Sequence, residues 1–514
     1  MTTPENTFDA IVIGSGIGGM SAAVHLANND KRVLLLEAAL DFGGYTNPFK
    51  RKKFHFDPGL HYIGELNPGD FFHETLVKLQ LRDRVEFNRL DEDCYDRYVF
   101  PGMDFRMPSS RELFRARLEE HFPEEKQGID KFIRMINALK INPGDADEMK
   151  NAFAEVRAID GSEVLATIRK RTYGEVMRHF FGDNDLIKAV LSGPCGDIGL
   201  PPGRVSAMAL VGIHNHYLEG AFFPRGGSGA LRDAFIDRLK EQGAVLKNRT
   251  RVTRILVEDG RAVGVVTDKD EEFRASAVVS NVDPVLTFTK LIEPENVRAK
   301  TLKKAENIEA SYGSICFFVG TDMPPENIGV GQENIWYYPT TDIDKEYEDA
   351  AKVTVPTGDF SFFLSAPSRK DPGGGKCPPG TEVLEMVLLS NYEPFAKWAD
   401  QRALQRDDEY KDLKNEIKSV LIKQLERTYA PGLGENIIVS EVSTPVTNTY
   451  YASPYKGSIY GPAHTPDQLG MGRFMPRGTV KDLYLCGAGV FNCGIGPCCI
   501  SGYFAADLAL KDGK

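Results

Sequence analysis

A glycine-rich turn near the N-terminus has the residue types and spacing that bind a dinucleotide. Gly14-Ser-Gly16-Ile-Gly18-Gly19 lies between an apolar run at 10–13 and an alanine-rich segment at 20–27, and Glu37 ends the next apolar run, 33–36. This is a βαβ unit, in which glycines let the backbone approach a pyrophosphate and the helix N-terminus attracts its charge. The acid accepts hydrogen bonds from ribose hydroxyls. The predicted cofactor contacts are Gly14, Gly16, Ile17, Gly18, Gly19 and Glu37.

The residues after this unit indicate which dinucleotide binds. Gly43-Gly44-Tyr45-Thr46 and Phe56-Asp57-Pro58-Gly59 resemble the GG-x-x-T and D-x-G elements of the FAD-dependent amine oxidase and phytoene desaturase superfamily. In that superfamily the glycine pair lies along the FAD pyrophosphate and the flavin edge. The resemblance implies FAD as the cofactor, with contacts from Gly43, Gly44, Tyr45, Thr46, Asp57 and Gly59.

Two later segments extend the resemblance. The segment 222–231 resembles the superfamily's (Y/F)P-x-GG-x-x-x-L element, and 244–281 reads as strands with a hairpin turn at Asp259-Gly260. At the C-terminus, a strand at 482–487 precedes a glycine-rich turn and a helix begun by Pro497. The superfamily points this last helix at the flavin pyrimidine, where it would stabilise negative charge. The implied contacts are Gly226, Gly227, Val252, Asn281, Gly487, Gly489, Gly496 and Pro497.

Two stretches narrow the resemblance. Phe-Asp-Pro-Gly-Leu-His-Tyr-Ile-Gly at 56–64 and the run 483–494 are similar to the retinol saturase and carotenoid isomerase branch. That branch implies an FAD-dependent oxidoreductase acting on carbon–carbon bonds of a long apolar polyene or isoprenoid by hydride exchange with flavin N5. Saturation, desaturation and cis–trans isomerisation all stay open. Pro-Cys-Cys at 497–499 departs from the small residues expected there, which leaves the flavin-site geometry open as well.

The pattern predicts an α/β protein of two domains. A Rossmann-type FAD-binding domain, split in sequence, is expected from 1–64, 221–284 and 471–514, and an α+β substrate-binding domain with a mixed sheet and a helical insertion from 65–220 and 285–470. The run 371–380, rich in glycine and proline, is predicted to be a surface loop.

His61, Tyr62 and Glu65 are the predicted catalytic residues. They follow the Asp-Pro-Gly turn, which the superfamily places near the flavin, and the reaction needs a proton donor or acceptor. The alternative for His61 is a histidine that simply bonds to the backbone, the commoner role of a lone histidine.

Two other groups could suggest a metal or redox site. His214 and His216 are two residues apart, so on a helix they share no face, and no metal site is predicted. Cys493, Cys498 and Cys499 could form a redox relay, because a helix N-terminus lowers a thiol pKa. Apolar packing around the flavin is the favoured interpretation, since buried free cysteine is common.

The composition and the N-terminal sequence limit the binding partners and the cellular compartment that we expect. The chain of 514 residues has a net charge of −11, which argues against nucleic-acid binding. The N-terminus lacks signal-peptide features and no apolar run is long enough to span a bilayer, so a cytoplasmic protein is expected. The basic run 50–53 could contact an anionic membrane surface, or it could be a solvated strand edge. An apolar helix face at 71–79 could also contact a membrane, and core packing explains it equally well.

The expected partner is an apolar small molecule. No second Gly-x-Gly-x-x-Gly lies between a strand and a helix, so the electron partner is not identified. Three alternatives stay open: a flavin amine oxidase, a fatty-acyl desaturase or hydratase, and an FAD-bearing lipid-binding protein without enzymatic activity.

Overall fold

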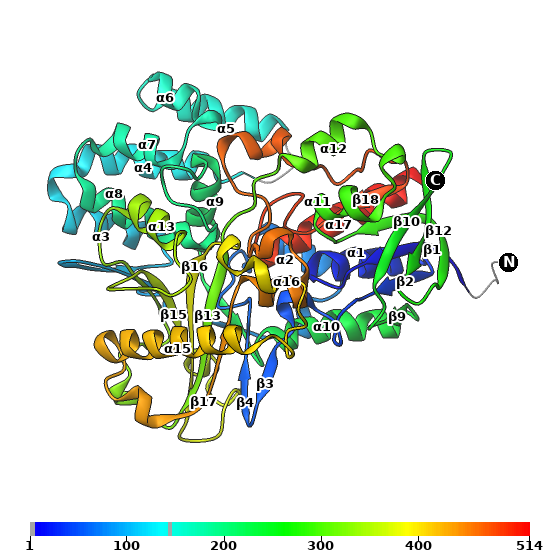
Figure 1. Cartoon of the computed structure of the whole chain (residues 1–514). Helices are drawn as coiled ribbons and strands as arrows, with labels where there is room; N and C mark the ends of the chain where they lie inside the picture. Colours follow the sequence, from blue (N-terminus) through cyan, green and yellow to red (C-terminus); the bar gives the residue numbers. More distant parts are fainter. Residues whose placement is uncertain (1–5, 142–145, 514) are drawn as a thin grey trace.

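The computed structural model describes residues 6–141 and 146–513, and within them two large sheets organise the chain (Figure 1). The first sheet has a parallel core in the order β9-β2-β1-β12-β18. Its strands are β1 (Thr7–Ile13), β2 (Val33–Leu36), β9 (Val245–Lys247), β12 (Glu272–Ser280) and β18 (Leu483–Leu485). The antiparallel strands β10 (Val252–Glu258) and β11 (Arg261–Thr267) extend this sheet beside β12.

Three helices pack against the parallel core. Helix α1 (Ile17–Ala27) contacts both α17 (Ile495–Asp512) and α10 (Ser228–Glu241). Every residue of α1 is buried, because the alanines and glycines let α17 approach closely: a Cβ on Gly502 would lie 1.9 Å from the carbonyl oxygen of Gly18. Helix α1 begins at Ile17, directly after the glycine turn, and α17 begins two residues before Pro497. Pro497 therefore sits in the first turn, where its missing N–H leaves no bond unmade.

The second sheet has the order β17-β13-β16-β15-β14-β6-β7. It is antiparallel except between β14 and β6, so it is mixed as predicted. Its strands are β6 (Asp96–Phe100), β7 (Met103–Met107), β13 (Gly313–Thr321), β14 (Asn334–Tyr337), β15 (Phe362–Ser365), β16 (Glu382–Ser390) and β17 (Ile437–Ser443). Helix α15 (Asp408–Thr428) runs along it and closes a core around Phe317, Leu364 and Leu421 (Figure 1).

A group of helices forms the predicted insertion. It contains α3 (Arg111–His121), α4 (Lys126–Ala138), α5 (Ala146–Ala158), α6 (Glu163–Ala166), α7 (Tyr173–Phe181), α8 (Asp185–Ser192) and α9 (Ala207–Tyr217). The remaining helices are α2 (Phe71–Lys78), α11 (Pro284–Leu286), α12 (Ala299–Glu306), α13 (Ile343–Ala350), α14 (Pro367–Lys370) and α16 (Pro445–Ala452). The remaining strands form two small antiparallel pairs, the hairpin of β3 (Phe49–Arg51) with β4 (Phe54–Phe56) and the long-range pair of β5 (Phe87–Arg89) with β8 (Phe222–Pro224).

The predicted α/β class, with a Rossmann-type domain and a mixed-sheet domain, is confirmed. Strands of the first sheet lie within 7–36, 245–280 and 483–485, and those of the second within 96–107, 313–390 and 437–443. The exact domain boundaries stay a prediction.

The structure shows how far two segments, the run 371–380 and the helix at 71–79, are exposed to solvent. The run 371–380 is not simply a surface loop, because Asp371 and Lys376 are buried. On α2 and just after it, Phe72, Leu76 and Leu79 are buried, which favours core packing over a membrane-facing surface. Among the helices of the described residues, none combines the length and apolarity needed to cross a bilayer.

Candidate active site

Three glycine segments from distant parts of the chain face one another at the carboxyl end of the parallel strands. A Cβ atom on Gly18 would lie 2.7 Å from Oδ1 of Asn281 and 3.0 Å from the backbone nitrogen of Gly487. A Cβ on Gly44 would lie 3.2 Å from the Cα of Gly16. These glycines therefore let the three segments approach more closely than side chains would allow, and together they form what we call the glycine cradle. The arrangement fits a pyrophosphate held by backbone N–H groups at the start of α1.

Glu37 lies beside this cradle at the end of β2. Its Oε2 accepts hydrogen bonds from the N–H of Ser15 at 2.8 Å and from the Ser15 hydroxyl at 2.6 Å, and its Oε1 accepts from the N–H of Ala39. The Ser15 hydroxyl in turn accepts from the N–H of Gly43, which ties the two glycine segments together. The carboxylate is thus fixed with lone pairs left for ribose hydroxyls. The backbone carbonyl of Glu37 accepts from Thr250, two residues before the buried Val252.

Arg473 is a buried cation near the C-terminal glycine turn. Its guanidinium donates to the carbonyl oxygens of Pro462 at 3.2 Å and Ala488 at 3.0 Å, and it lies 2.9 Å from Nε2 of His464. Burial lowers the pKa of Arg473 to about 10. Across residues 6–141 and 146–513 no carboxylate lies within ion-pair distance of it, and its Nε has no hydrogen-bond partner. A buried cation without a counter-charge suits a site that receives an anionic cofactor.

Asp57 anchors the Asp-Pro-Gly turn to helix α10. Its Oδ1 accepts from the N–H of Ser228 at 3.1 Å and from the Ser228 hydroxyl at 2.6 Å, while its Oδ2 pairs with the ammonium of Lys376. Gly227 packs against this ion pair so closely that a Cβ would overlap the Lys376 ammonium. Asp57 and Gly227 therefore lie in one buried polar cluster, and their contact with the cofactor stays a prediction.

His61 is held from two sides. Its Nδ1 lies 3.1 Å from Oε2 of the buried Glu385, whose Oε1 accepts from the N–H of Asp57 at 2.8 Å. Its carbonyl oxygen accepts from the ammonium of Lys370 at 2.8 Å. Burial raises the pKa of Glu385, and His61 opposes that shift. His61 is therefore a side chain oriented by a carboxylate, and its catalytic role stays a prediction.

Tyr62 lies between two carboxyl groups. Its hydroxyl is 2.9 Å from Oδ2 of Asp197 and 3.1 Å from Oδ2 of Asp96. Asp96 also accepts from Nδ2 of Asn334 at 2.8 Å and from Nε1 of Trp336 at 3.2 Å. The phenol is thus the link in a buried chain of polar groups that joins the second sheet to the helical insertion.

Glu65 is separated from the other two predicted catalytic residues. Its Oε1 lies 3.6 Å from Nδ1 of His216, and Nε2 of that histidine accepts from the N–H of Gly64. His214, in contrast, is buried against the Tyr173 hydroxyl and the Leu191 carbonyl. The two histidines therefore serve different contacts, and among the described side chains no group of three or more His, Cys, Asp or Glu is placed to hold a metal.

Aromatic rings surround the Tyr62 hydroxyl network. The Tyr62 ring stacks on Tyr217 with centroids 4.5 Å apart, and Phe363 contacts His61 at 5.0 Å and Trp336 at 4.7 Å. All of these rings except His61 are buried. They form an apolar wall beside the Asp-Pro-Gly turn, which we call the aromatic wall: Tyr62, Tyr217, Trp336 and Phe363.

The cysteines at the start of α17 are buried and free. Burial raises the pKa of Cys493 and Cys499 to about 12 and that of Cys498 further. Loss of hydration therefore acts against the thiol activation that a redox relay needs, which supports the favoured interpretation of apolar packing. These thiols pack as small apolar groups.

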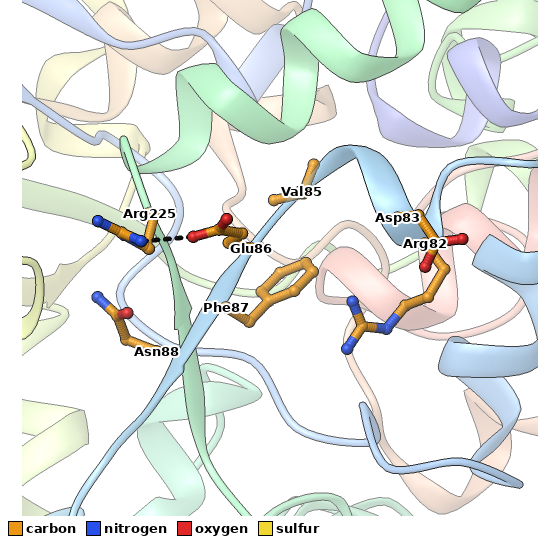
Figure 2. Close-up of a pocket in the computed structure, with 7 residues that line it drawn as sticks. All are labelled: Arg82, Asp83, Val85, Glu86, Phe87, Asn88 and Arg225. Atoms are coloured by element: carbon orange, nitrogen blue, oxygen red, sulfur yellow. Dashed lines mark hydrogen bonds and ion pairs between the residues drawn. The ribbon is translucent and has the colours of Figure 1, made fainter.

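A surface pocket of about 440 Å³ lies elsewhere, beside β5 and the start of α10. Figure 2 shows Glu86 paired with Arg225 at one side and Arg82 at the other. It contains none of the predicted site residues. Of the predicted cofactor residues, Gly16, Gly18, Gly44, Asn281 and Gly487 lie around the glycine cradle, and their contact with the cofactor stays a prediction.

Sequence reasoning missed Asp96, Asp197, Lys370, Asn334 and Trp336. None belongs to a local motif, because four separate segments bring them together: β6 carries Asp96, the turn after α8 carries Asp197, β14 carries Asn334 and Trp336, and α14 carries Lys370. The available signal was a polar residue in an apolar setting: Asp96 lies among tyrosines at 95–98 and Asp197 between glycines at 196 and 199.

Comparison with known proteins fits this geometry. Residues 17–510 match the family model described as flavin containing amine oxidoreductase. All-trans-retinol 13,14-reductase of Danio rerio is 29% identical over 525 residues, covering 96% of this chain and 84% of the relative. The chloroplastic prolycopene isomerase of Arabidopsis thaliana is 28% identical over 495 residues, covering 93% and 76%.

A solved oxidoreductase from Methanosarcina mazei superposes with a TM-score of 0.66 at 16% identity, covering 97% of this chain and 99% of that one, which supports the fold. The predicted FAD cofactor, the predicted enzyme class and the suspected family are confirmed. The chain belongs to the flavin-containing amine oxidoreductase family and is an FAD-dependent oxidoreductase.

Proposed function

We propose that this protein transforms carbon–carbon double bonds of a long apolar polyene or isoprenoid. The observation that carries the proposal is the aromatic wall, which offers a buried apolar surface directly after the Asp-Pro-Gly turn. Flat conjugated chains bury well against such rings. The names of the relatives, a retinol reductase and a prolycopene isomerase, support the same substrate class.

The chain's own residues have three tasks in such a reaction. Bound FAD supplies hydride exchange at N5 of its flavin ring. The glycine cradle and Glu37 hold the cofactor, the aromatic wall orients the substrate and excludes water, and a titratable side chain moves one proton. Tyr62 belongs to the wall and His61 contacts its Phe363, which supports the last task, while Glu65 contacts His216, whose ring packs on Tyr217.

The electron partner and any membrane contact also belong to the proposal. The exposed basic run Lys50, Lys52 and Lys53 lies at the β3–β4 turn and would face an anionic surface. Because no second dinucleotide motif is present, electrons enter or leave through another molecule or cancel within one turnover. A cytoplasmic protein that meets its substrate at a membrane surface fits these features.

The experiment compares two substrate classes on the same flavoprotein without oxygen. All-trans-retinol and prolycopene are added to protein with reduced or oxidised flavin, and simple amines are added to the oxidised form. The absorbance of the polyene reports saturation, desaturation and isomerisation, because each changes the conjugated system. We expect polyene absorbance to change and amines to leave the flavin oxidised. Rapid flavin reduction by an amine, with unchanged polyenes, would overturn the proposal.

A further inference from the structure

The hydroxyl of Tyr62 has one proton to share between two carboxyl groups that both lie within hydrogen-bond distance. If it donates to Asp197, then Asp96 can bond to the phenol oxygen only by carrying a proton itself, and the reverse holds for Asp197. The geometry therefore favours one protonated carboxyl in the pair. Two carboxyl groups coupled in this way titrate as a unit.

The two carboxyl groups differ in their surroundings. Asp96 has no exposed surface and is fixed by Asn334 and Trp336. Asp197 is partly exposed, and the described residues place no donor other than Tyr62 on its carboxyl group. Its backbone carbonyl contacts Sγ of Cys493 at 3.8 Å, in the glycine-rich turn ahead of α17. Asp197 is thus the member of the pair that a bound substrate could reach.

We infer that Asp197 is the acid that exchanges a proton with the substrate, and that Tyr62 and Asp96 are positioning residues that hold this proton ready. This inference rests on the proposed function, which it deepens by naming the proton carrier. It also gives Tyr62 a defined task, as the hydroxyl that links the two carboxyl groups.

The electrostatic surroundings support a neutral acid. Burial raises the pKa of Asp197 to about 7 and raises that of Asp96 well above its ordinary value, and the Asp197 carboxylate further disfavours charge on Asp96. Lys370, whose pKa burial lowers to about 7, is bound to Asn334 and opposes the shift of Asp96. The titratable groups that face the pair are Tyr62, Tyr95, Tyr98, Cys493, His216, Tyr217, Tyr460 and Lys370.

The step balances in the reductive direction. One carbon of the double bond receives a hydride, with its electron pair, from the reduced flavin, and the other carbon receives the proton of Asp197. The π bond breaks, two C–H bonds form, the flavin is left oxidised and Asp197 is left as a carboxylate that regains a proton from water. Desaturation is the reverse, with the Asp197 carboxylate accepting the proton.

The first test is the pH dependence of a single turnover. Protein reduced with dithionite is mixed with all-trans-retinol, and the rate of polyene loss is measured across pH 5 to 9. We expect the wild-type rate to fall about tenfold per pH unit above about 7. Asp197→Asn should lower the rate at pH 6 by about 100-fold or more and remove the pH dependence. Asp344→Asn, a carboxylate elsewhere that accepts from the N–H of Gly203, should keep the wild-type rate and profile.

A wild-type rate and profile in Asp197→Asn would overturn the inference. Should that variant fail to fold, Tyr62→Phe decides, because it removes only the hydroxyl between the carboxyl groups. It should move the midpoint of the rate profile by at least about one pH unit, since the coupling between the two acids is lost. An unmoved midpoint in Tyr62→Phe would also overturn the inference.

The second test needs no substrate and separates this inference from the proposed function. Infrared spectra of the FAD-loaded wild type and of FAD-loaded Asp197→Asn are recorded from pH 5 to 9. The spectrum of the variant is subtracted from that of the wild type at each pH. We expect the difference spectrum to contain a protonated carboxyl band, from Asp197, that disappears near pH 7. If this band is present but every polyene is recovered unchanged, the proposed function is wrong, whereas the inference that Asp197 carries a proton is still supported. Absence of the band from the difference spectrum at pH 6 would overturn the inference itself.

Discussion

The buried ion pair between Asp57 and Lys376 gives the sharpest stability prediction. The Asp57 side chain has no exposed surface and the Lys376 side chain is 3% exposed. Removing one partner of a buried pair leaves an uncompensated charge and costs about 3–5 kcal/mol. Asp57 keeps its two hydrogen bonds from Ser228, which compensate part of the loss. We therefore expect Lys376→Met to lower the free energy of unfolding by about 3 kcal/mol, the lower end of that range.

The assay is a double-mutant cycle. The free energy of unfolding is taken from urea midpoints of the wild type, Lys376→Met, Asp57→Asn and the double variant. The double variant should be little worse than either single variant, because it leaves no unpaired charge, which gives a coupling energy of about 2–3 kcal/mol. Lys345→Met breaks an exposed pair with Asp349 on α13, with side chains 67% and 51% exposed, and should change stability by less than about 0.5 kcal/mol.

Two results would refute this reasoning. One is a loss below about 1 kcal/mol in Lys376→Met, which would mean that water reaches the pair. The other is additive losses in the double variant, which would mean that the two charges stabilise the fold independently.

Three further predictions concern the cofactor cradle and the helical insertion. Glu37→Gln should weaken FAD binding about 10–100-fold, since charge-assisted hydrogen bonds contribute about 1.5–3 kcal/mol. Titration of the apoprotein with FAD measures the Kd, and an unchanged Kd would exclude the carboxylate as a ligand. Gly18→Ala should weaken FAD binding at least about tenfold, because its Cβ would lie 3.0 Å from a backbone nitrogen across the cradle; wild-type affinity in the same titration would contradict the cradle. Burial lowers the pKa of His214 to about 4, so protonation favours the unfolded chain, and about 3 kcal/mol of stability should be lost as the pH falls from about 6.5 to 4. In His214→Gln, the free energy of unfolding should depend less steeply on pH across this range. A decline as steep as in the wild type would mean that other groups cause the acid sensitivity.

The sequence predicted the parts of the site that depend on local spacing. The βαβ unit, the Gly43-Gly44 pair and the glycine turn before α17 each lie within a few residues, so their geometry follows from turn and helix rules. Asn281 also lies on the cradle, facing Gly16, Gly18 and Gly487, and its predicted contact with the cofactor stays a prediction.

The polar networks could not be predicted in the same way. Tyr62 meets Asp96 and Asp197 across 34 and 135 residues, and Lys376 meets Asp57 across 319 residues. No periodicity links such positions, because only the packing of the second sheet, the helical insertion and the run 371–380 around the Asp-Pro-Gly turn brings them together. The run 371–380 shows the consequence: its glycines and prolines indicate a surface loop, yet the Lys376 ammonium is drawn inside by a carboxylate that the local pattern does not reveal.

The measurement that tests the central claim most directly is the identity of the product. FAD-loaded protein with reduced flavin is incubated without oxygen with all-trans-retinol or prolycopene, and the product's mass and chromatographic retention are read together. We expect either a product that has gained one pair of hydrogen atoms or an isomer of unchanged mass and shifted retention. Polyenes recovered unchanged in both mass and retention, while the protein retains its flavin and oxidises amines, would contradict it.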